Sequence, residues 1–211
     1  MLQLCECPPE QFTARRLSAQ EFCALAQTEA GSLYRPRSEV LRMLTVGQAF
    51  GVCAALDRPD AALLVLPAEA NLALAAALRE WIGLPRQRTY ILTPPINSDP
   101  ATVRQLLAAA KRYLHRLAPG CPVWAVLERT PEAEPLVPLY LQQGFALRAL
   151  RPLTGLSPWY LFTADGPDPA DQGVWVELAD ATHLALLLCR GWAAVASRPT
   201  PAGCALQLVP T

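Results

Sequence analysis

The stretch from Pro100 to Leu117 constrains this chain more than any other part of its sequence. Its apolar side chains recur at the spacing of one face of an α-helix. They are Val103, Leu106, Leu107, Ala110 and Leu114. Basic side chains gather in the last two turns, where positive charge complements the helix dipole. They are Lys111, Arg112, His115 and Arg116. We therefore expect one long helix whose apolar face packs on a partner layer.

Apolar segments on either side of this helix predict strands. Thr89–Thr93 precedes it and must end at Pro94-Pro95, because proline cannot donate a hydrogen bond to a sheet. Pro122–Leu127 follows it and has the composition of a buried strand. Helices that alternate with strands in this way indicate the α/β class.

The first third of the chain predicts two helices followed by a hairpin. Phe12–Leu17 is typical of a strand, and Ser18 with Glu21 forms a capping box at the start of a helix that ends near Gly31. A second helix is expected from Ser38 to Gly47. The remaining expected elements are a hairpin of Ala49–Leu56 with Ala61–Leu66 and a helix over Asn71–Ile82.

The last part of the chain predicts a short helix, two strands, a linker and an extension. The helix covers Pro135–Gln143, with Gly144 as its stop, and the strands are Phe145–Leu150 and Trp159–Phe162. Residues 165–173 contain no large apolar side chain and predict a linker between a domain of residues 1–164 and an extension of residues 174–211. We expect the extension to hold a strand, a helix capped by Asp180 and one or two further strands, and either to extend the sheet or to cover one of its edges.

Composition excludes several classes of function. The 18 basic and 18 acidic side chains cancel, which argues against nucleic acid as a partner. The most apolar stretch, 61–78, is interrupted by polar residues and proline, so no membrane span is expected. The odd count of 7 cysteines and a first segment without the features of a secretory signal favour a reducing, cytoplasmic setting. Cys5-x-Cys7 lacks a second pair at zinc-like spacing, so no metal site is predicted.

The order of these elements, combined with Leu139-Tyr140-Leu141-Gln142-Gln143-Gly144-Phe145, resembles the GNAT family of acyl-CoA-dependent N-acyltransferases. The family's final helix typically reads Leu-Tyr-x-x-x-Gly-Phe, and the resemblance covers roughly Phe12 to Ala164. It implies a mixed α/β sheet flanked by helices, with residues 174–211 as a β/α extension. It also implies acetyl-CoA or another acyl-CoA as cofactor, and a small amine or a peptide amino group as acceptor. A homodimer is an open alternative to a single copy.

The resemblance assigns roles to two side chains. Tyr140 matches the family tyrosine that protonates the leaving thiolate, a role suited to a phenol whose ordinary pKa is about 10. The alternative is that Tyr140 only packs on the sheet. Glu128, at the end of a core-like strand, could accept a proton from the amine, directly or through water. Its alternative role is that of an exposed charge paired with Arg129 or another arginine.

In this family a glycine-rich loop before the long helix presents backbone amides to the cofactor's diphosphate. The stretch in that register here is Ser98-Asp99-Pro100-Ala101-Thr102-Val103, which has no glycine. Asp99 is the expected N-cap and Pro100 has no amide hydrogen. The candidate phosphate contacts are Ser98, Ala101, Thr102, Val103 and Arg104, with Arg104 in reach of Asp99 if it folds back. The alternative is a non-catalytic protein of this fold, a binding or scaffold protein that has lost the cofactor.

Overall fold

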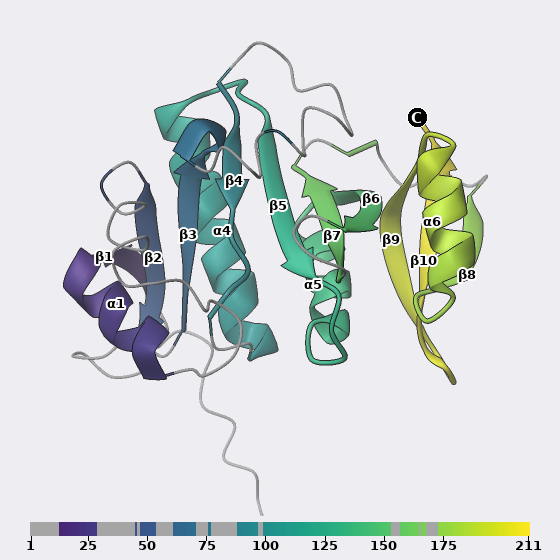
Figure 1. Ribbon diagram of the computed structural model, residues 1–211, viewed down its shortest axis with the longest axis horizontal. Coiled ribbons are helices and arrows are strands. Elements are labelled where there is room, and N and C mark those ends of the chain that lie inside the picture. The colour runs from purple at the N-terminus through teal and green to yellow at the C-terminus, as the bar shows by residue number, and fades with distance from the viewer. Residues whose placement is uncertain are drawn as a thin grey trace, which may run out of the picture.

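The computed structural model describes residues 13–28, 45, 47–53, 61–70, 76, 88–96, 99–152, 157–164, 166–167 and 173–211. Three expected elements lie mostly outside these residues. Of the helix expected from Ser38 to Gly47, only positions 45 and 47 are described, and of the helix over 71–82 only position 76. Three positions of the linker 165–173 are described. The rest of the chain forms one mixed sheet with helices on both faces, as the sequence predicts (Figure 1).

Ten strands make up the described sheet, in the order β1-β2-β3-β4-β5-β7-β6-β9-β10-β8. Within the described ladders only β4 and β5 run parallel, and all other pairs are antiparallel. The strands are β1 (Thr13–Leu17), β2 (Gln48–Cys53), β3 (Ala61–Pro67), β4 (Tyr90–Leu92), β5 (Val123–Glu128), β6 (Ala146–Pro152), β7 (Pro158–Thr163), β8 (Val174–Glu177), β9 (Trp192–Thr200) and β10 (Gly203–Pro210).

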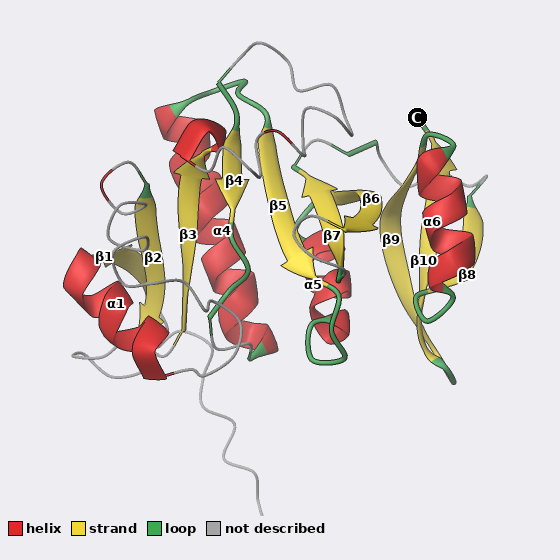
Figure 2. Cartoon of the chain, in the orientation of Figure 1, coloured by secondary structure: helices red, strands yellow, loops and turns green. Residues whose placement is uncertain are grey.

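The helices are α1 (Ala19–Thr28), α4 (Pro100–Leu117), α5 (Val137–Gln142) and α6 (Ala181–Cys189), with single turns at Ala68–Ala70 and Glu134–Leu136. In Figure 2, α1 lies in front of the sheet and α4 lies behind it. The side chains of β3 explain this arrangement, because successive residues of a strand point to opposite faces. Leu63 and Val65 join the core under α4, whereas Leu64 and Leu66 join the cluster that contains Phe22 of α1.

Local sequence signals account for the ends of these elements. Ser18 Oγ accepts a hydrogen bond from the amide of Glu21 at 3.3 Å, and the amide of Ser18 donates to the Glu21 carboxylate at 2.8 Å, which confirms the capping box. Gly144 has a φ of 75°, the left-handed conformation that ends α5. Lys111 of α4 donates a hydrogen bond of 2.6 Å to the carbonyl of Gln143, which ties α4 to the end of α5.

Strands β4 and β5 part after a short parallel ladder. The ladder runs from Tyr90 opposite Val123 to Leu92 opposite Ala125. The chain after β4 then stays with β3, through hydrogen bonds that join Thr93 to Leu64 and Ile96 to Ala62. Meanwhile β5 continues to Glu128 along β7. Among the described residues no hydrogen bond links the two strands beyond Ala125, so the sheet divides next to the N-terminus of α4.

The C-terminal extension continues the sheet. Leu147 of β6 lies opposite Ala194 of β9, and β10 and β8 follow outward. Asp180 caps α6 by accepting a hydrogen bond from the amide of His183 at 3.0 Å, as the sequence predicts. Of the two arrangements expected for the extension, the structure therefore shows the one that lengthens the sheet.

The packing of α4 on the sheet makes a direct stability prediction. Leu107 is 0% exposed and Leu117, on the same helix, is 51% exposed. Leu107→Ala should lower the free energy of unfolding by about 2–5 kcal/mol, because it leaves a cavity in the core. Leu117→Ala should change it by less than about 0.5 kcal/mol. Urea denaturation of both variants measures the difference, and equal effects would contradict the position of α4.

Candidate active site

Tyr140 lies on α5 in the centre of the core. Its side chain is 0% exposed, and its ring stacks on Phe162 of β7 with the centroids 4.7 Å apart. Its hydroxyl has no hydrogen-bond partner among the residues that the structure describes. A buried hydroxyl without a partner costs folding free energy. This is therefore a polar atom whose place in the fold is not explained by packing alone.

Burial raises the pKa of Tyr140 well above its ordinary value. The phenol therefore keeps its proton at every physiological pH, and it can donate a hydrogen bond. The same shift makes the buried phenol a weaker acid toward a thiolate than a phenol with the ordinary pKa of about 10. In the enclosed state, Tyr140 suits hydrogen bonding to a negatively charged atom better than complete proton transfer.

Glu128 ends β5 and is partly exposed. The expected alternative partner, Arg129, is engaged elsewhere: its guanidinium lies 3.3 Å from the carboxylate of Glu134. Arg129 Nε also donates a hydrogen bond of 3.2 Å to the hydroxyl of Tyr160. No ion pair or hydrogen bond of the Glu128 side chain occurs among the described residues. Its carboxylate is therefore available to a ligand.

Sequence reasoning missed the group formed by Arg129, Glu134 and Tyr160. Arg129 and Glu134 stand at the two ends of a turn, and nothing in their spacing marks them as partners. Burial raises the pKa of Tyr160 to about 12 and is the largest cause of that shift. Together these residues hold the turn that leads from β5 to α5, and so they position both Glu128 and Tyr140.

The two candidate catalytic side chains lie on opposite faces of the sheet. Leu127 packs in the same core as Tyr140, whereas Val126 packs with Trp124 on the other face. Because side chains alternate along a strand, Glu128 points to the face of Val126. The two groups therefore make no contact.

Asp99 closes the N-terminus of α4, as the sequence predicts. Its carboxylate accepts hydrogen bonds from the Thr102 amide at 3.1 Å and from the Thr102 hydroxyl at 2.7 Å. The Val103 amide donates to the Asp99 carbonyl at 3.0 Å. Hydrogen bonds from Thr102, with a smaller contribution from the Ala101 amide, hold the pKa of Asp99 below its ordinary value. The amides expected to meet a diphosphate thus already have an acceptor.

Of the remaining expected phosphate contacts, Ser98 lies outside the described residues, whereas Arg104 lies within them. Arg104 is exposed on the first turns of α4, and it is not among the groups that lower the pKa of Asp99. Arg104 therefore does not neutralise the carboxylate in this structure.

The residues fit the two ends of an acyl-CoA differently. At the thioester end, the hydroxyl of Tyr140 has no partner among the described residues, and this donor suits a sulfur atom that gains negative charge. At the diphosphate end, a helix dipole offers about 0.3–1 kcal/mol to an anion. A carboxylate about 4 Å away costs about 4 kcal/mol at an effective dielectric of 20. The start of α4 therefore does not accept a diphosphate while Asp99 caps it.

The described residues offer neither a metal site nor a membrane-spanning helix. These residues contain no cluster of three or more His, Cys, Asp or Glu side chains that could hold a metal ion. In the same residues, no helix combines the length and the apolar character needed to cross a membrane.

Comparisons with known proteins identify the fold. No protein-family model matches this sequence, and no curated protein does either. Among solved structures, a protein from Desulfovibrio desulfuricans described as an acetyltransferase of the GNAT family aligns with a TM-score of 0.50 at 15% identity, over 73% of this chain and 98% of its own. An N-acetyltransferase from Staphylococcus aureus aligns with a TM-score of 0.51 at 12% identity, over 73% and 97%.

A third neighbour is NAA60 of Arabidopsis thaliana in complex with acetyl-CoA, with a TM-score of 0.50 at 11% identity, over 72% of this chain and 97% of its own. At these identities the likeness establishes the fold. The chain has the GNAT fold, which confirms the expectation drawn from the element order and the Leu139–Phe145 motif.

The partnerless hydroxyl of Tyr140 predicts an unusual effect on stability. Tyr140→Phe should raise the free energy of unfolding by about 1 kcal/mol, because it removes a buried group that has no hydrogen bond. Tyr160→Phe is the matched control and should lower it by about 1 kcal/mol, because it removes the acceptor of Arg129. Denaturant titration measures both. A Tyr140→Phe variant as unstable as Tyr160→Phe would show that the Tyr140 hydroxyl is bonded in the folded protein.

The cap of α4 predicts a pH-dependent contribution to stability. Asp99→Ala should lower the free energy of unfolding by about 1 kcal/mol at neutral pH. The folded-state pKa of Asp99 lies below the unfolded value of about 3.9, so the carboxylate stabilises the fold above that value and loses its effect as the pH falls through the folded pKa. Urea titrations of wild type and variant should therefore converge in acid. A constant difference at all pH values would assign the effect to something other than the carboxylate.

Proposed function

We propose that this protein is an N-acyltransferase that uses acetyl-CoA or another acyl-CoA and modifies a small amine or the amino group of a peptide. The observation that carries the proposal is the hydroxyl of Tyr140, which is buried with no partner among the described residues of a GNAT fold. Its ring packs on Phe162, which lies opposite Ala125 at the end of the β4–β5 ladder. The fold suggests the class of reaction by analogy alone. The side chains at the site are the evidence for the reaction itself.

The solved neighbours support the choice of cofactor and acceptor. The NAA60 structure holds acetyl-CoA. A structure of the NatC complex, which aligns with a TM-score of 0.50 at 10% identity, holds CoA and a Gag peptide. For this chain we infer the same two classes of ligand, an acyl-CoA and an amine.

In the proposed reaction, Tyr140 and Glu128 act from opposite faces of the sheet. Bound acyl-CoA would supply an activated acyl group and a sulfur leaving group. Tyr140, on the face of α5, holds its proton and donates a hydrogen bond toward the place where negative charge develops. Glu128, on the other face, has a free carboxylate that can take a proton from an amine, directly or through water. The gap beyond Ala125 is where both groups would reach one substrate.

Cofactor binding would start with a change at Asp99. Its carboxylate must leave Thr102 before the amides of Ala101 and Thr102 can serve a diphosphate, and the Val103 amide must also leave the Asp99 carbonyl. Ser98 and Arg104 complete the proposed contacts at this end. The reaction is expected in the cytoplasm and without nucleic acid, and these two points stay predictions.

The closed helix start favours a second candidate function. A protein of this fold that no longer binds an acyl-CoA would keep Asp99 on Thr102 permanently and would leave Tyr140 enclosed. Such a protein would act as a binding or scaffold module. The two hydrogen bonds from Thr102 to Asp99 are the observation in favour of it.

Thermal unfolding with acetyl-CoA separates the two functions. If the protein is an acyltransferase, millimolar acetyl-CoA should raise its melting temperature, because a ligand at 100 times its Kd adds about 2.7 kcal/mol. Release of free thiol in the presence of spermidine or a short peptide then measures turnover. Tyr140→Phe and Glu128→Gln should lower kcat at least about tenfold while leaving the thermal shift in place.

The double variant Asp99→Gly/Pro100→Gly tests whether the cap of α4 prevents the protein from binding acetyl-CoA. If wild type gives no thermal shift but this variant does, the protein has lost the cofactor through its cap, and the second function holds. Asp180→Gly removes the cap of α6 and controls for the loss of a helix cap elsewhere. No shift with wild type or with the double variant would overturn the acyltransferase proposal.

A further inference from the structure

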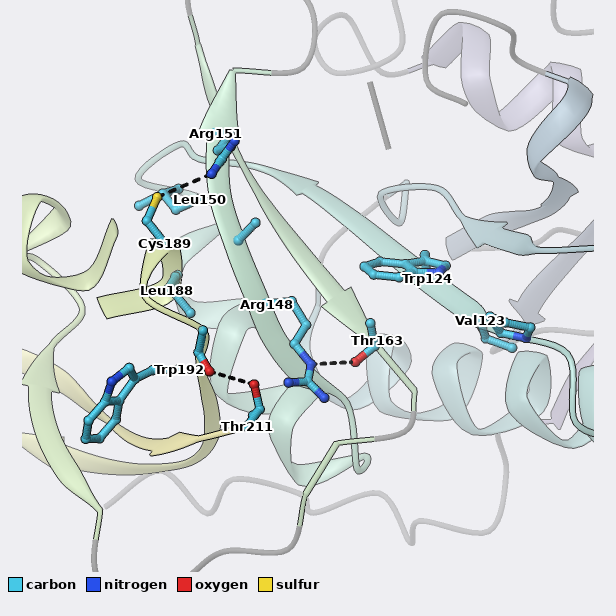
Figure 3. Close-up of a pocket in the computed structure, with 13 residues that line it drawn as sticks. Val123, Trp124, Arg148, Leu150, Arg151, Thr163, Leu188, Cys189, Trp192 and Thr211 are labelled. Carbon is cyan, nitrogen blue, oxygen red and sulfur yellow. Dashed lines mark hydrogen bonds between the residues drawn. The ribbon is translucent and has the colours of Figure 1, made fainter. Parts of the chain in front are cut away.

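A cavity of about 540 Å³ lies where the C-terminal extension meets the rest of the sheet (Figure 3). Its walls come from β5, β6 and β7 on one side and from the end of α6 and the start of β9 on the other. This size falls within the range of small-molecule sites. The cavity is separate from Tyr140, Glu128 and the start of α4, since none of these residues lines it.

A β-bulge directs Arg148 toward this cavity. Leu147 lies opposite Phe162 and Ala149 lies opposite Leu161, so Arg148 is the extra residue of β6 and is paired with no residue of β7 in the ladder. Bulges re-aim a side chain at the cost of one ladder position, and they recur beside functional sites. Figure 3 shows the Arg148 side chain in the cavity, where Nε donates a hydrogen bond of 3.3 Å to the hydroxyl of Thr163.

Positive charge prevails among the described residues that line the cavity. Two of them are arginines, Arg148 and Arg151, and none is an Asp or Glu. Arg148 is partly buried, and this burial lowers the pKa of its guanidinium, yet an arginine stays charged at neutral pH. Arg151 donates only a 3.5 Å hydrogen bond to the thiol of Cys189. A half-buried cation without a carboxylate is unfavourable unless an anion completes it.

Apolar and aromatic side chains make up much of the remaining wall, beside the polar residues Thr163 and Thr211. Leu150 and Leu188 are buried, and the rings of Trp124 and Trp192 also line the cavity. The Trp124 ring is nine-tenths buried, and its Nε1–H has no acceptor within the described part of the chain. An apolar body with one charged end would satisfy both the arginines and these walls.

We propose that this cavity binds a small organic anion with an apolar body, its charged end held by Arg148 and Arg151. The extension, residues 174–211, thus supplies one wall of a second ligand site in addition to three strands of the sheet. The proposal does not depend on acyl transfer, because it uses none of the residues of the candidate active site.

Tryptophan fluorescence tests the proposal on the whole protein, since Trp124 and Trp192 line the cavity. The probe is 4-phenylbutyrate, with neutral 4-phenylbutanamide as a partner of the same shape. The acid should change the fluorescence in a saturable way, and the amide should bind at least tenfold more weakly. Benzyl phosphate in a parallel titration tells whether a carboxylate or a phosphate end is preferred, and either preference supports an anion site.

Variants assign the effect to the cavity. Arg148→Met keeps the apolar stem, removes the charge and should weaken 4-phenylbutyrate binding at least tenfold, while Arg116→Met on α4 should leave it unchanged. Circular dichroism checks that each variant is folded. The comparison of acid with amide needs no variant, so it decides the matter even if Arg148→Met does not fold. Equal affinity for acid and amide, no saturable signal with either acid, or full binding by folded Arg148→Met would overturn the proposal.

Discussion

The division of the sheet after Ala125 is the constraint on which the rest of this structure depends. Thr93 and Ile96 keep the chain after β4 on β3, and the ladder with β7 keeps β5 on the other side. Each strand satisfies its backbone with a different neighbour, so the gap costs few hydrogen bonds. Glu128 ends the strand on one side of this division, and Tyr140 packs on Phe162, which lies opposite Ala125 at the end of the β4–β5 ladder.

The start of α4 shows how one residue can change the use of a fold. A helix N-terminus is well suited to an anion, and Asp99 supplies one from within the chain. The carboxylate satisfies the same amides that a diphosphate would use, and the hydroxyl of Thr102 adds a second bond. The cap therefore raises the stability of the fold and lowers its affinity for the cofactor. An acyltransferase built in this way would bind its cofactor only after giving up that stability.

Local patterns in the sequence predicted most of the fold. The apolar spacing and Pro100 placed α4 at the bounds that the structure shows, and the cap at Asp99 followed from its position before Pro100. Those signals act within a few residues. The burial of Tyr140 depends on β7, and the direction of Arg148 depends on the register between β6 and β7. Such pairings join residues that are far apart in the sequence, so no local pattern around these residues predicts them.

The Tyr140 hydroxyl and the Arg148 guanidinium are polar groups that the described residues satisfy only in part or not at all, and they lie in different places. The Tyr140 hydroxyl is buried in the core, and the guanidinium of Arg148 donates to Thr163 but meets no Asp or Glu among the described residues that line the cavity. Each group lowers the stability of the fold. Phe in place of Tyr140, or an apolar residue in place of Arg148, would avoid that cost. Residues that break a local rule without gain to the fold are the ones expected to serve a ligand. The same reasoning separates them from Asp99, whose bonds are complete and whose role in stability needs no ligand.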